Sequence, residues 1–208
     1  MALVELSASD LASLLCSRVC HDVISPVGAI NNGLELLDDG GADEDAMDLI
    51  RQSAISASAR LQFARIAFGA AGSAGVQIDT GDAQAVAENY LKNEKPEFTW
   101  NGPRAYLAKN KVKLILNMIL IGIGSIPRGG SLDLDLQVEG EECSFTLTAM
   151  GRMKRIPQKF QDYIDGRMGE DAIDAHSVQY YYTILLAKDA GMEIKIHMDD
   201  DKVVYSAN

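Results

Sequence analysis

The chain has 208 residues, 47% of them hydrophobic, which is enough apolar material for a folded core and excludes a mainly disordered protein. Its 19 Lys and Arg against 30 Asp and Glu leave a formal net charge of -11, so direct binding to nucleic acid or to an anionic membrane is not expected. The longest apolar run, residues 114–126, is interrupted by polar and glycine residues and is shorter than the roughly 20 residues that cross a bilayer. Three cysteines and no signal-peptide pattern predict a cytoplasmic protein with reduced thiols.

The first predicted element is a long helix that carries a narrow apolar stripe. Its apolar positions step by 4, 3, 4, 3, 4 and 3 residues, a spacing that keeps side chains on one side of a helix. Ser7, followed three residues later by Asp10, predicts the N-terminal cap, and the residues from Asp38 to Gly41 predict the end. The stripe, which we expect to be buried, consists of Cys16, Cys20, Val23, Val27, Ile30, Leu34 and Leu37.

A second long helix follows a short loop and an acidic first turn, residues 43–45. Its apolar stripe consists of Met47, Ile50, Ala54, Ala57, Leu61, Ala64 and Phe68. The short loop predicts an antiparallel hairpin. Because two isolated helices bury little apolar area, we expect a second copy of the chain to cover them in a dimeric four-helix bundle.

A glycine- and serine-rich segment, residues 69–75, predicts a linker between two domains, residues 1–72 and 76–208. In the second domain the pattern predicts an α/β sandwich with helices on one face of the sheet, which makes the fold class α+β. We expect strands at 76–79, 98–100, 132–138, 143–149, 193–198 and 203–206, and helices at 105–123, 157–164 and 172–190.

His21 is the main candidate functional residue. At 100° per residue it points about 140° away from the predicted buried stripe, so it faces outward. Asp22 follows it directly and could orient or deprotonate the imidazole. Pro26 within the helix should bend the axis, because it lacks an N–H and its ring clashes with the preceding turn. Candidate docking residues on the same outward side are Arg18, Ser25, Gly28 and Asn32.

Two other interpretations of this segment stay open. An exposed histidine can simply be solvated, and Gly28 and its small neighbours could serve tight helix packing rather than the approach of a partner. A zinc site made of Cys16, Cys20 and His21 is not expected, because their side chains diverge by about 100° and no second ligand pair has zinc-finger spacing. The sequence therefore predicts no metal site.

The segment 18–26, with its His-Asp-x-x-Ser-Pro core, resembles the phosphoacceptor box of histidine kinases. A helical hairpin followed by an α/β domain of about 130 residues resembles their layout, a dimerisation and phosphotransfer bundle followed by a Bergerat-type ATP-binding domain. The resemblance covers nearly the whole chain. It implies that His21 carries a phosphoryl group and that Asp22 assists it.

The residues that hold ATP in such kinases are missing. Asn117 aligns with the first asparagine of the kinase magnesium box, but Ile121 replaces the second one. Ala149 and Met153 replace an aspartate and a glycine of the adenine box, and His-Ser-Val-Gln at 176–179 replaces the glycine-rich phosphate loop. The second domain therefore resembles a degenerate ATP-binding domain, and we expect no bound cofactor.

Segments 21–37 and 176–187 resemble the alphaproteobacterial cell-cycle histidine phosphotransferases. This resemblance implies relay of a phosphoryl group from the receiver domain of a CckA-type hybrid kinase to CtrA-type and CpdR-type response regulators, with Mg²⁺ supplied by the partner receiver. The alternatives are a divergent ATP-dependent histidine kinase and a non-catalytic dimeric scaffold for response regulators. His176 and His197 are interpreted as structural.

Overall fold

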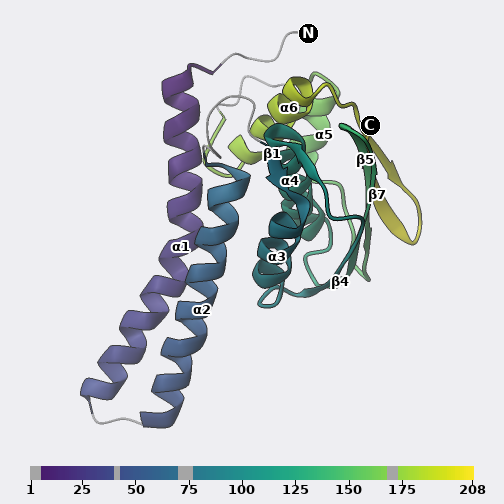
Figure 1. Cartoon of the computed structure of the whole chain (residues 1–208). Helices are drawn as coiled ribbons and strands as arrows, with labels where there is room; N and C mark the ends of the chain where they lie inside the picture. The colour runs from purple at the N-terminus through teal and green to yellow at the C-terminus, as the bar shows by residue number, and fades with distance from the viewer. Residues whose placement is uncertain (1–5, 40–42, 70–76, 168–172) are drawn as a thin grey trace.

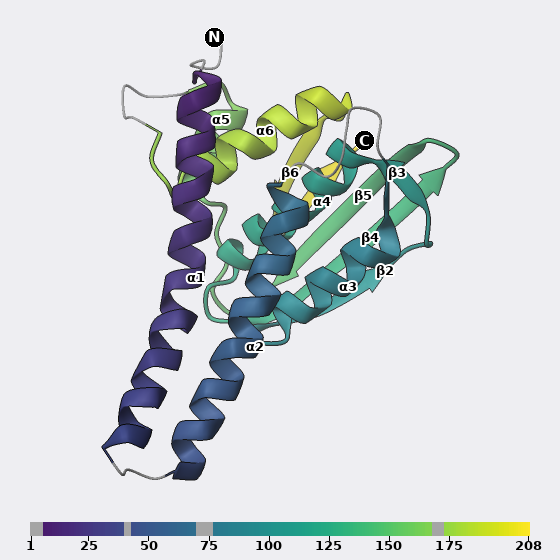
Figure 2. The same ribbon diagram turned by 60° about the vertical axis from the view of Figure 1, so that its left-hand side comes forward.

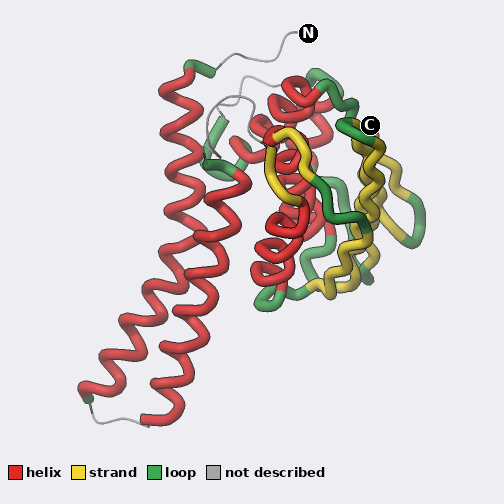
Figure 3. Tube along the Cα trace, viewed as in Figure 1, coloured by secondary structure: helices red, strands yellow, loops and turns green. Residues whose placement is uncertain are grey.

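A computed structural model describes residues 6–39, 43–69, 77–167 and 173–208. Two long helices form a hairpin that extends beyond the rest of the molecule, and the remaining chain forms an α/β domain against one end of it (Figures 1 and 2). Figure 3 shows that all the strands belong to the α/β domain. No helix among the described residues is both long and apolar enough to cross a membrane. The predicted α+β class is confirmed.

The helical hairpin consists of α1 (Ala8–Asp38) and α2 (Asp43–Ala67). The α/β domain, residues 77–208, contains the other elements: β1 (Gln77–Asp79), α3 (Thr80–Leu91), β2 (Pro96–Asn101), β3 (Tyr106–Ala108), α4 (Lys109–Ser125), β4 (Gly130–Glu139), β5 (Glu142–Met150), α5 (Gln158–Ile164), α6 (Val178–Ala190), β6 (Ile194–Met198) and β7 (Lys202–Ala207).

The hairpin forms as its sequence predicts. Ser7 caps α1, because its side-chain oxygen accepts a hydrogen bond from the backbone N–H of Asp10. Pro26 lies within α1, and the helix changes direction about halfway along its length (Figure 1). The two helices approach closely at Gly33, where an added Cβ would lie 2.6 Å from a side-chain carbon of Ile50. Helix α1 ends at Asp38, within the end predicted for residues 38–41. Gly40, Gly41 and most of the predicted linker lie outside the described residues.

The two apolar stripes of the hairpin are only partly covered within one chain, where Ala57 is buried but other members stay exposed. Cys16 and Cys20 are exposed, so their predicted burial is wrong for the single chain. Val27 and Leu34 of α1 keep 43% and 48% of their area exposed, and Leu61 of α2 keeps 49%. The spacing of the stripe shows which side of the helix is apolar, but it does not show what covers that side.

The α/β domain is built on a five-stranded sheet in the order β2-β4-β5-β7-β6. The first pair, β2 and β4, is parallel, and the other neighbours are antiparallel. In β4, β5 and β7 alternate residues are buried, which means that one sheet face is covered and the other is open. Helices cover a single face, as predicted (Figure 2). A separate small sheet pairs β1 with β3.

Helix α4 is the centre of this core. Its apolar residues are buried almost around the whole helix, because the sheet covers one side and the other helices cover the rest. At the end of α4, Ser125 and Tyr205 of β7 share a hydrogen bond between their hydroxyl groups.

Three details of the α/β domain differ from the prediction. Helix α3 was missed, because it presents mainly small buried residues such as Ala83 and Ala87 to the core. Residues 106–108 form β3 and not the first turn of α4, because they pair with β1. Helix α6 begins at Val178 and not near 172, since residues 174–177 form a hydrogen-bonded turn.

The hairpin and the α/β domain are joined by specific contacts. The buried side-chain amide of Asn117 in α4 donates to the carbonyl oxygen of Ala67, the last residue of α2, over 3.1 Å. Arg60 of α2 pairs with Glu94, which follows α3, at 2.6 Å. Helix α6 lies beside the N-terminal half of α1, where the hydroxyl of Tyr181 accepts a hydrogen bond from the backbone N–H of Leu6 (Figure 2). These contacts place the N-terminal half of α1 and the C-terminal half of α2 next to the α/β domain.

Candidate functional site

The imidazole of His21 lies in the middle of α1 with 63% of its side-chain area exposed, so it faces outward as predicted. It lines an open groove of about 510 Å³ on the side of the hairpin that faces the α/β domain. The groove brings together residues of α1, α2 and the loop after α3, namely His21, Asp22, Ser25, Pro26, Ala29, Leu49, Gln52, Ser53, Ser56, Arg60 and Asn93.

The nearest charged group to His21 is the carboxylate of Asp22. Its Oδ1 lies 3.7 Å from Nδ1 of His21, which is too long for a hydrogen bond but close enough for a charge interaction. The other oxygen, Oδ2, accepts a hydrogen bond from Nε of Arg18 over 3.0 Å. Arg18 lies one turn before Asp22, so the helix itself sets this spacing. Arg18 therefore holds Asp22 rather than pointing freely into solvent.

A second histidine contacts His21 from the α/β domain. The ring centroids of His21 and His176 lie 5.0 Å apart, and the planes meet at 78°, an edge-to-face arrangement. His176 belongs to the turn before α6. In that turn the carboxylate of Asp174 accepts hydrogen bonds from the backbone N–H groups of His176 and Ser177. The hydrogen bond from the Ser177 N–H is the main reason that the pKa of Asp174 lies well below its usual range. The hydrogen bond from the His176 N–H lowers this pKa further, by a smaller amount.

The predicted docking residues fall into three positions. Ser25 lines the groove with His21 and Asp22. Gly28 and Asn32 lie farther along α1, where an added Cβ at Gly28 would meet nothing within 4 Å. Arg18 lies outside the groove lining and is paired with Asp22. Pro26 has no N–H to donate to the carbonyl of Asp22, which frees that carbonyl beside His21.

Several residues of the groove were not found by reading the sequence. Helix α2 contributes Gln52, Ser56 and Arg60, polar residues that lie outside the predicted apolar stripe. Arg60 is fixed by Glu94 and lies over the ring of Tyr90 at 5.3 Å. Burial raises the pKa of Tyr90 to about 12. The contribution of Asn93 had no signal in the sequence, since only the tertiary packing brings it to α1. His176, which the sequence analysis interprets as structural, contacts His21 from outside the groove lining.

The positions that hold ATP in histidine kinases are mostly buried by this chain's own side chains. Asn117, Ala149 and Val178 are fully buried. The side-chain amide of Gln179 donates to the backbone carbonyl of Asn117. Phe160 of α5 is fully buried as well, with its ring against Tyr180 and Tyr205.

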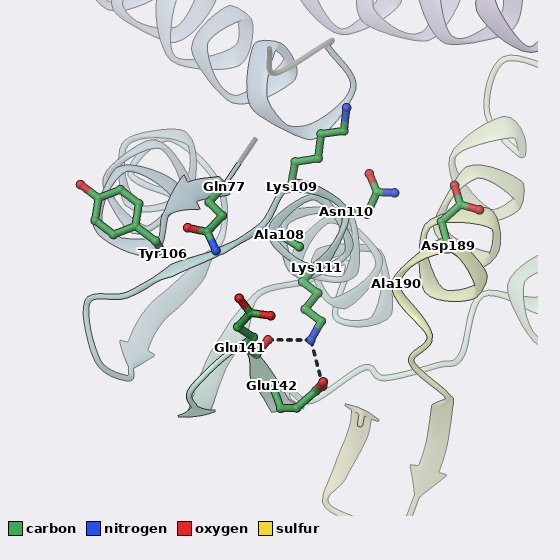
Figure 4. A pocket seen from close by; sticks show the side chains of 10 residues that line it. All are labelled: Gln77, Tyr106, Ala108, Lys109, Asn110, Lys111, Glu141, Glu142, Asp189 and Ala190. Carbon is green, nitrogen blue, oxygen red and sulfur yellow. Dashed lines mark hydrogen bonds and ion pairs between the residues drawn. The ribbon is translucent and has the colours of Figure 1, made fainter. Parts of the chain in front are cut away.

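Another cavity, of about 430 Å³, lies at the start of α4 and is shown in Figure 4. Its most buried cation, Lys111, donates hydrogen bonds to the backbone carbonyl of Glu141 and to the carboxylate of Glu142. The cavity shares no lining residue with the groove of His21. Because its lysine is already paired within the protein, the groove beside His21 is the stronger candidate for a functional site.

Comparison with known proteins identifies the family of the chain. The family model for the histidine phosphotransferase C-terminal domain matches residues 80–202, more than half of the chain. The protein phosphotransferase ChpT of Brucella abortus (strain 2308) is 67% identical over 204 residues, which is 98% of this chain and 98% of that protein.

Two solved structures extend the comparison. One is a bacterial phosphotransferase determined at 1.7 Å, with a TM-score of 0.94 and 64% sequence identity. The match covers 99% of this chain and 98% of that chain. The histidine kinase domain of a blue-light-activated histidine kinase from Erythrobacter litoralis matches 96% of this chain and 94% of its own with a TM-score of 0.49 and 13% identity. The family match and the identity to ChpT show that this chain belongs to the histidine phosphotransferase family and is a protein phosphotransferase.

Proposed function

We propose that the chain relays a phosphoryl group through His21 between the receiver domain of a hybrid histidine kinase and the receiver domains of response regulators, as a homodimer and without binding ATP. The observation that carries the proposal is the exposed imidazole of His21 at the edge of an open groove, with a carboxylate beside its Nδ1. The partner classes, CckA-type kinases and CtrA-type and CpdR-type regulators, follow from the resemblance of the phosphoacceptor and α6 segments.

The transfer itself needs only a neutral imidazole and correct positioning. The lone pair of Nε2 attacks the phosphorus of the aspartyl phosphate in the donor receiver, an N–P bond forms, and the P–O bond to the aspartate breaks. The aspartate leaves as a carboxylate, and Nδ1 of His21 keeps its proton. The reverse reaction with a second receiver returns the imidazole to its neutral state. Such transfer depends mainly on in-line positioning and charge neutralisation, and the Mg²⁺ of the partner receiver supplies the latter.

Asp22 supports this step by its charge. When Nε2 carries the phosphoryl group, the ring is cationic, and the Asp22 carboxylate at 3.7 Å from Nδ1 stabilises that cation. Arg18 keeps the carboxylate in place through its hydrogen bond. Arg18 therefore acts on the imidazole through Asp22, and its contact with the phosphoryl group is not required by this geometry.

The absence of ATP binding is supported by the packing at the former nucleotide positions. Ile121, which replaces the magnesium-binding asparagine, has no oxygen to offer a metal and is buried. Ser177, Val178 and Gln179, which replace the glycine-rich loop, are buried too, and none of them is a glycine that would let the backbone approach phosphates closely. An isothermal titration with ATP and Mg²⁺ should show no heat of binding, whereas saturable binding would favour the divergent kinase.

The homodimer is supported by the uncovered apolar stripes. At 100° per residue, Val27 and Leu34 lie on the side of α1 that is turned away from its groove residues, and Leu61 is turned by about 100° from Arg60, a groove residue of α2. A second copy can cover the stripes and leave His21 free. The four helices then form a bundle in which each chain keeps its own phosphotransfer groove.

The direct test is to incubate the full-length protein with a radiolabelled, phosphorylated receiver domain and follow the label. We expect label on the wild-type chain, acid-labile as phosphohistidine is, and onward transfer to a second receiver. His21→Ala should carry no label, and His197→Ala should behave like wild type because His197 lies on β6, away from the groove. Binding of receivers without any label would favour the scaffold, and label on His21→Ala would reject the assignment.

A further inference from the structure

We propose that His176 is a positioning residue for His21, so that the α/β domain contributes a side chain to the phosphotransfer site. The inference rests on the proposed function of His21 and names a residue of a different domain that acts through it. Its basis is the edge-to-face contact of the two rings, with centroids 5.0 Å apart and planes at 78°.

The contact restricts His21 without covering it. His21 keeps 63% of its side-chain area exposed, so the neighbouring ring leaves most of the imidazole accessible. His176 is not among the residues that line the groove, so its contact with His21 adds to the groove residues without belonging to them. On its exposed side the imidazole can still reach an incoming phosphorus atom. An occluding role does not fit this geometry.

A side chain on an exposed helix surface would otherwise sample several rotamers. Asp22 holds His21 only by a charge interaction at 3.7 Å, which does not fix the plane of the ring. The edge of one ring against the face of the other does restrict that plane, because aromatic pairs prefer this arrangement. The contact therefore restricts the plane of the imidazole, and within that plane the charge interaction with Asp22 keeps Nδ1 on the side of the carboxylate.

The turn that carries His176 is built firmly enough for this role. Asp174 accepts hydrogen bonds from the backbone N–H groups of His176 and Ser177 and from the hydroxyl of Ser177. Ser177 is itself buried at the start of α6. Helix α6 contacts α1 directly, so the turn has a fixed distance from His21. The position of His176 is thus set by the packing of the α/β domain and not by its own exposed side chain.

The contact can be measured without any phosphotransfer. The chain contains three histidines, so proton NMR of the full-length protein gives three sets of imidazole signals. In His176→Ala the signals of His21 should shift, because the ring current of its neighbour is lost. In the matched control His197→Ala they should stay in place. His21 signals that are identical in wild type and His176→Ala would show that the rings do not meet in solution, and would overturn the inference.

The functional part is measured as the initial rate of label transfer from a phosphorylated receiver. We expect His176→Ala to lower this rate about three- to tenfold, the range that an aromatic pair of this kind can contribute. His176→Phe keeps a ring at the same place and should restore most of the rate. If His176 acted through its charge instead, the rate would stay low in this variant. Thermal unfolding is the control for folding: both variants should unfold at the same midpoint temperature as the wild type.

The outcomes separate this inference from the proposed function. If His21→Ala abolishes transfer and His176→Ala matches wild type, the relay stands and the positioning role fails. If His21→Ala still carries label, the relay through His21 fails. A slow His176→Phe variant, with the same rate as His176→Ala, also rejects positioning by ring contact.

Discussion

The helical hairpin and the α/β domain differ in how they bury their residues. Among the described residues of α1, Gly33 alone is buried, although the helix spans 31 residues. In α4, which spans 17 residues, most side chains are buried. The α/β domain therefore has a complete core of its own, whereas the hairpin keeps its apolar stripe on the surface and its histidine on the other side. This difference supports the proposal that further chains contact the hairpin.

The strongest test of this comparison removes the apolar stripe of the hairpin. The double substitution Leu34→Asp and Leu61→Asp should convert a dimer into a monomer, because it places charges within the proposed helix bundle, where they would be buried without partners. Sedimentation equilibrium measures the mass directly. Ile55→Asp is the matched control, since Ile55 is exposed on the side of α2 that faces α3. A dimer that survives the double substitution would place the interface elsewhere.

The second prediction concerns the core of the α/β domain. Phe160→Ala should lower the free energy of unfolding by about 3–5 kcal/mol, because it removes a fully buried ring that contacts Tyr180 and Tyr205. Chemical denaturation followed by circular dichroism checks this value. Phe98→Ala, at a partly buried position in β2, should cost less. Equal losses in the two variants would contradict the central role of Phe160 in the packing.

The third prediction sharpens the contact between the two helices of the hairpin. Gly33→Ala should destabilise the protein by about 1–3 kcal/mol, since the added Cβ would lie 2.6 Å from Ile50 and 3.2 Å from the carbonyl oxygen of Ala46. Gly28→Ala, where the added Cβ meets nothing within 4 Å, should stabilise the helix by up to about 1 kcal/mol. Thermal unfolding of both variants gives the sign of each stability change. A Gly33→Ala variant more stable than wild type would mean that the helices lie farther apart.

The smallest predicted effect depends on pH. The pKa of Asp174 is lowered in the folded protein, so its ionised form stabilises the fold above the unfolded pKa of about 3.9, and this contribution is lost as the pH falls through the lower folded value. Asp174→Asn should therefore cost about 1 kcal/mol at neutral pH. The difference in the free energy of unfolding between Asp174→Asn and wild type should become smaller below about pH 4, because Asp in the unfolded chain titrates near that pH. A difference that is constant with pH would show that charge is not the cause.

The sequence predicted the long elements well because their signals are local. The stripes of α1 and α2, the cap at Ser7 and the alternation in β4 and β5 depend on neighbouring residues alone. Helix α3 was missed because Ala83 and Ala87 give a weak apolar pattern. The start of α4 was misplaced because Tyr106 is held in a strand by pairing with β1, far away in the sequence.

The candidate site was predictable only in part, for the same reason. His21, Asp22 and Ser25 lie within one helix, so their common side follows from helix geometry. Their neighbours Arg60 and Asn93 come from other elements, and no spacing rule links them to α1. The exposure of Cys16 shows the remaining limit, because an apolar stripe looks the same whether its own chain or a second one covers it.

The hydrogen bond from Asn117 to Ala67 has a consequence for how the molecule moves. It ties the last turn of α2 to the centre of the α/β domain. Rotation of the domain away from α2 would break this buried hydrogen bond, at a cost of about 1 kcal/mol. The bond therefore favours one placement of the domain on the helices, so that in the proposed relay the receiver domains do the moving, toward and away from His21.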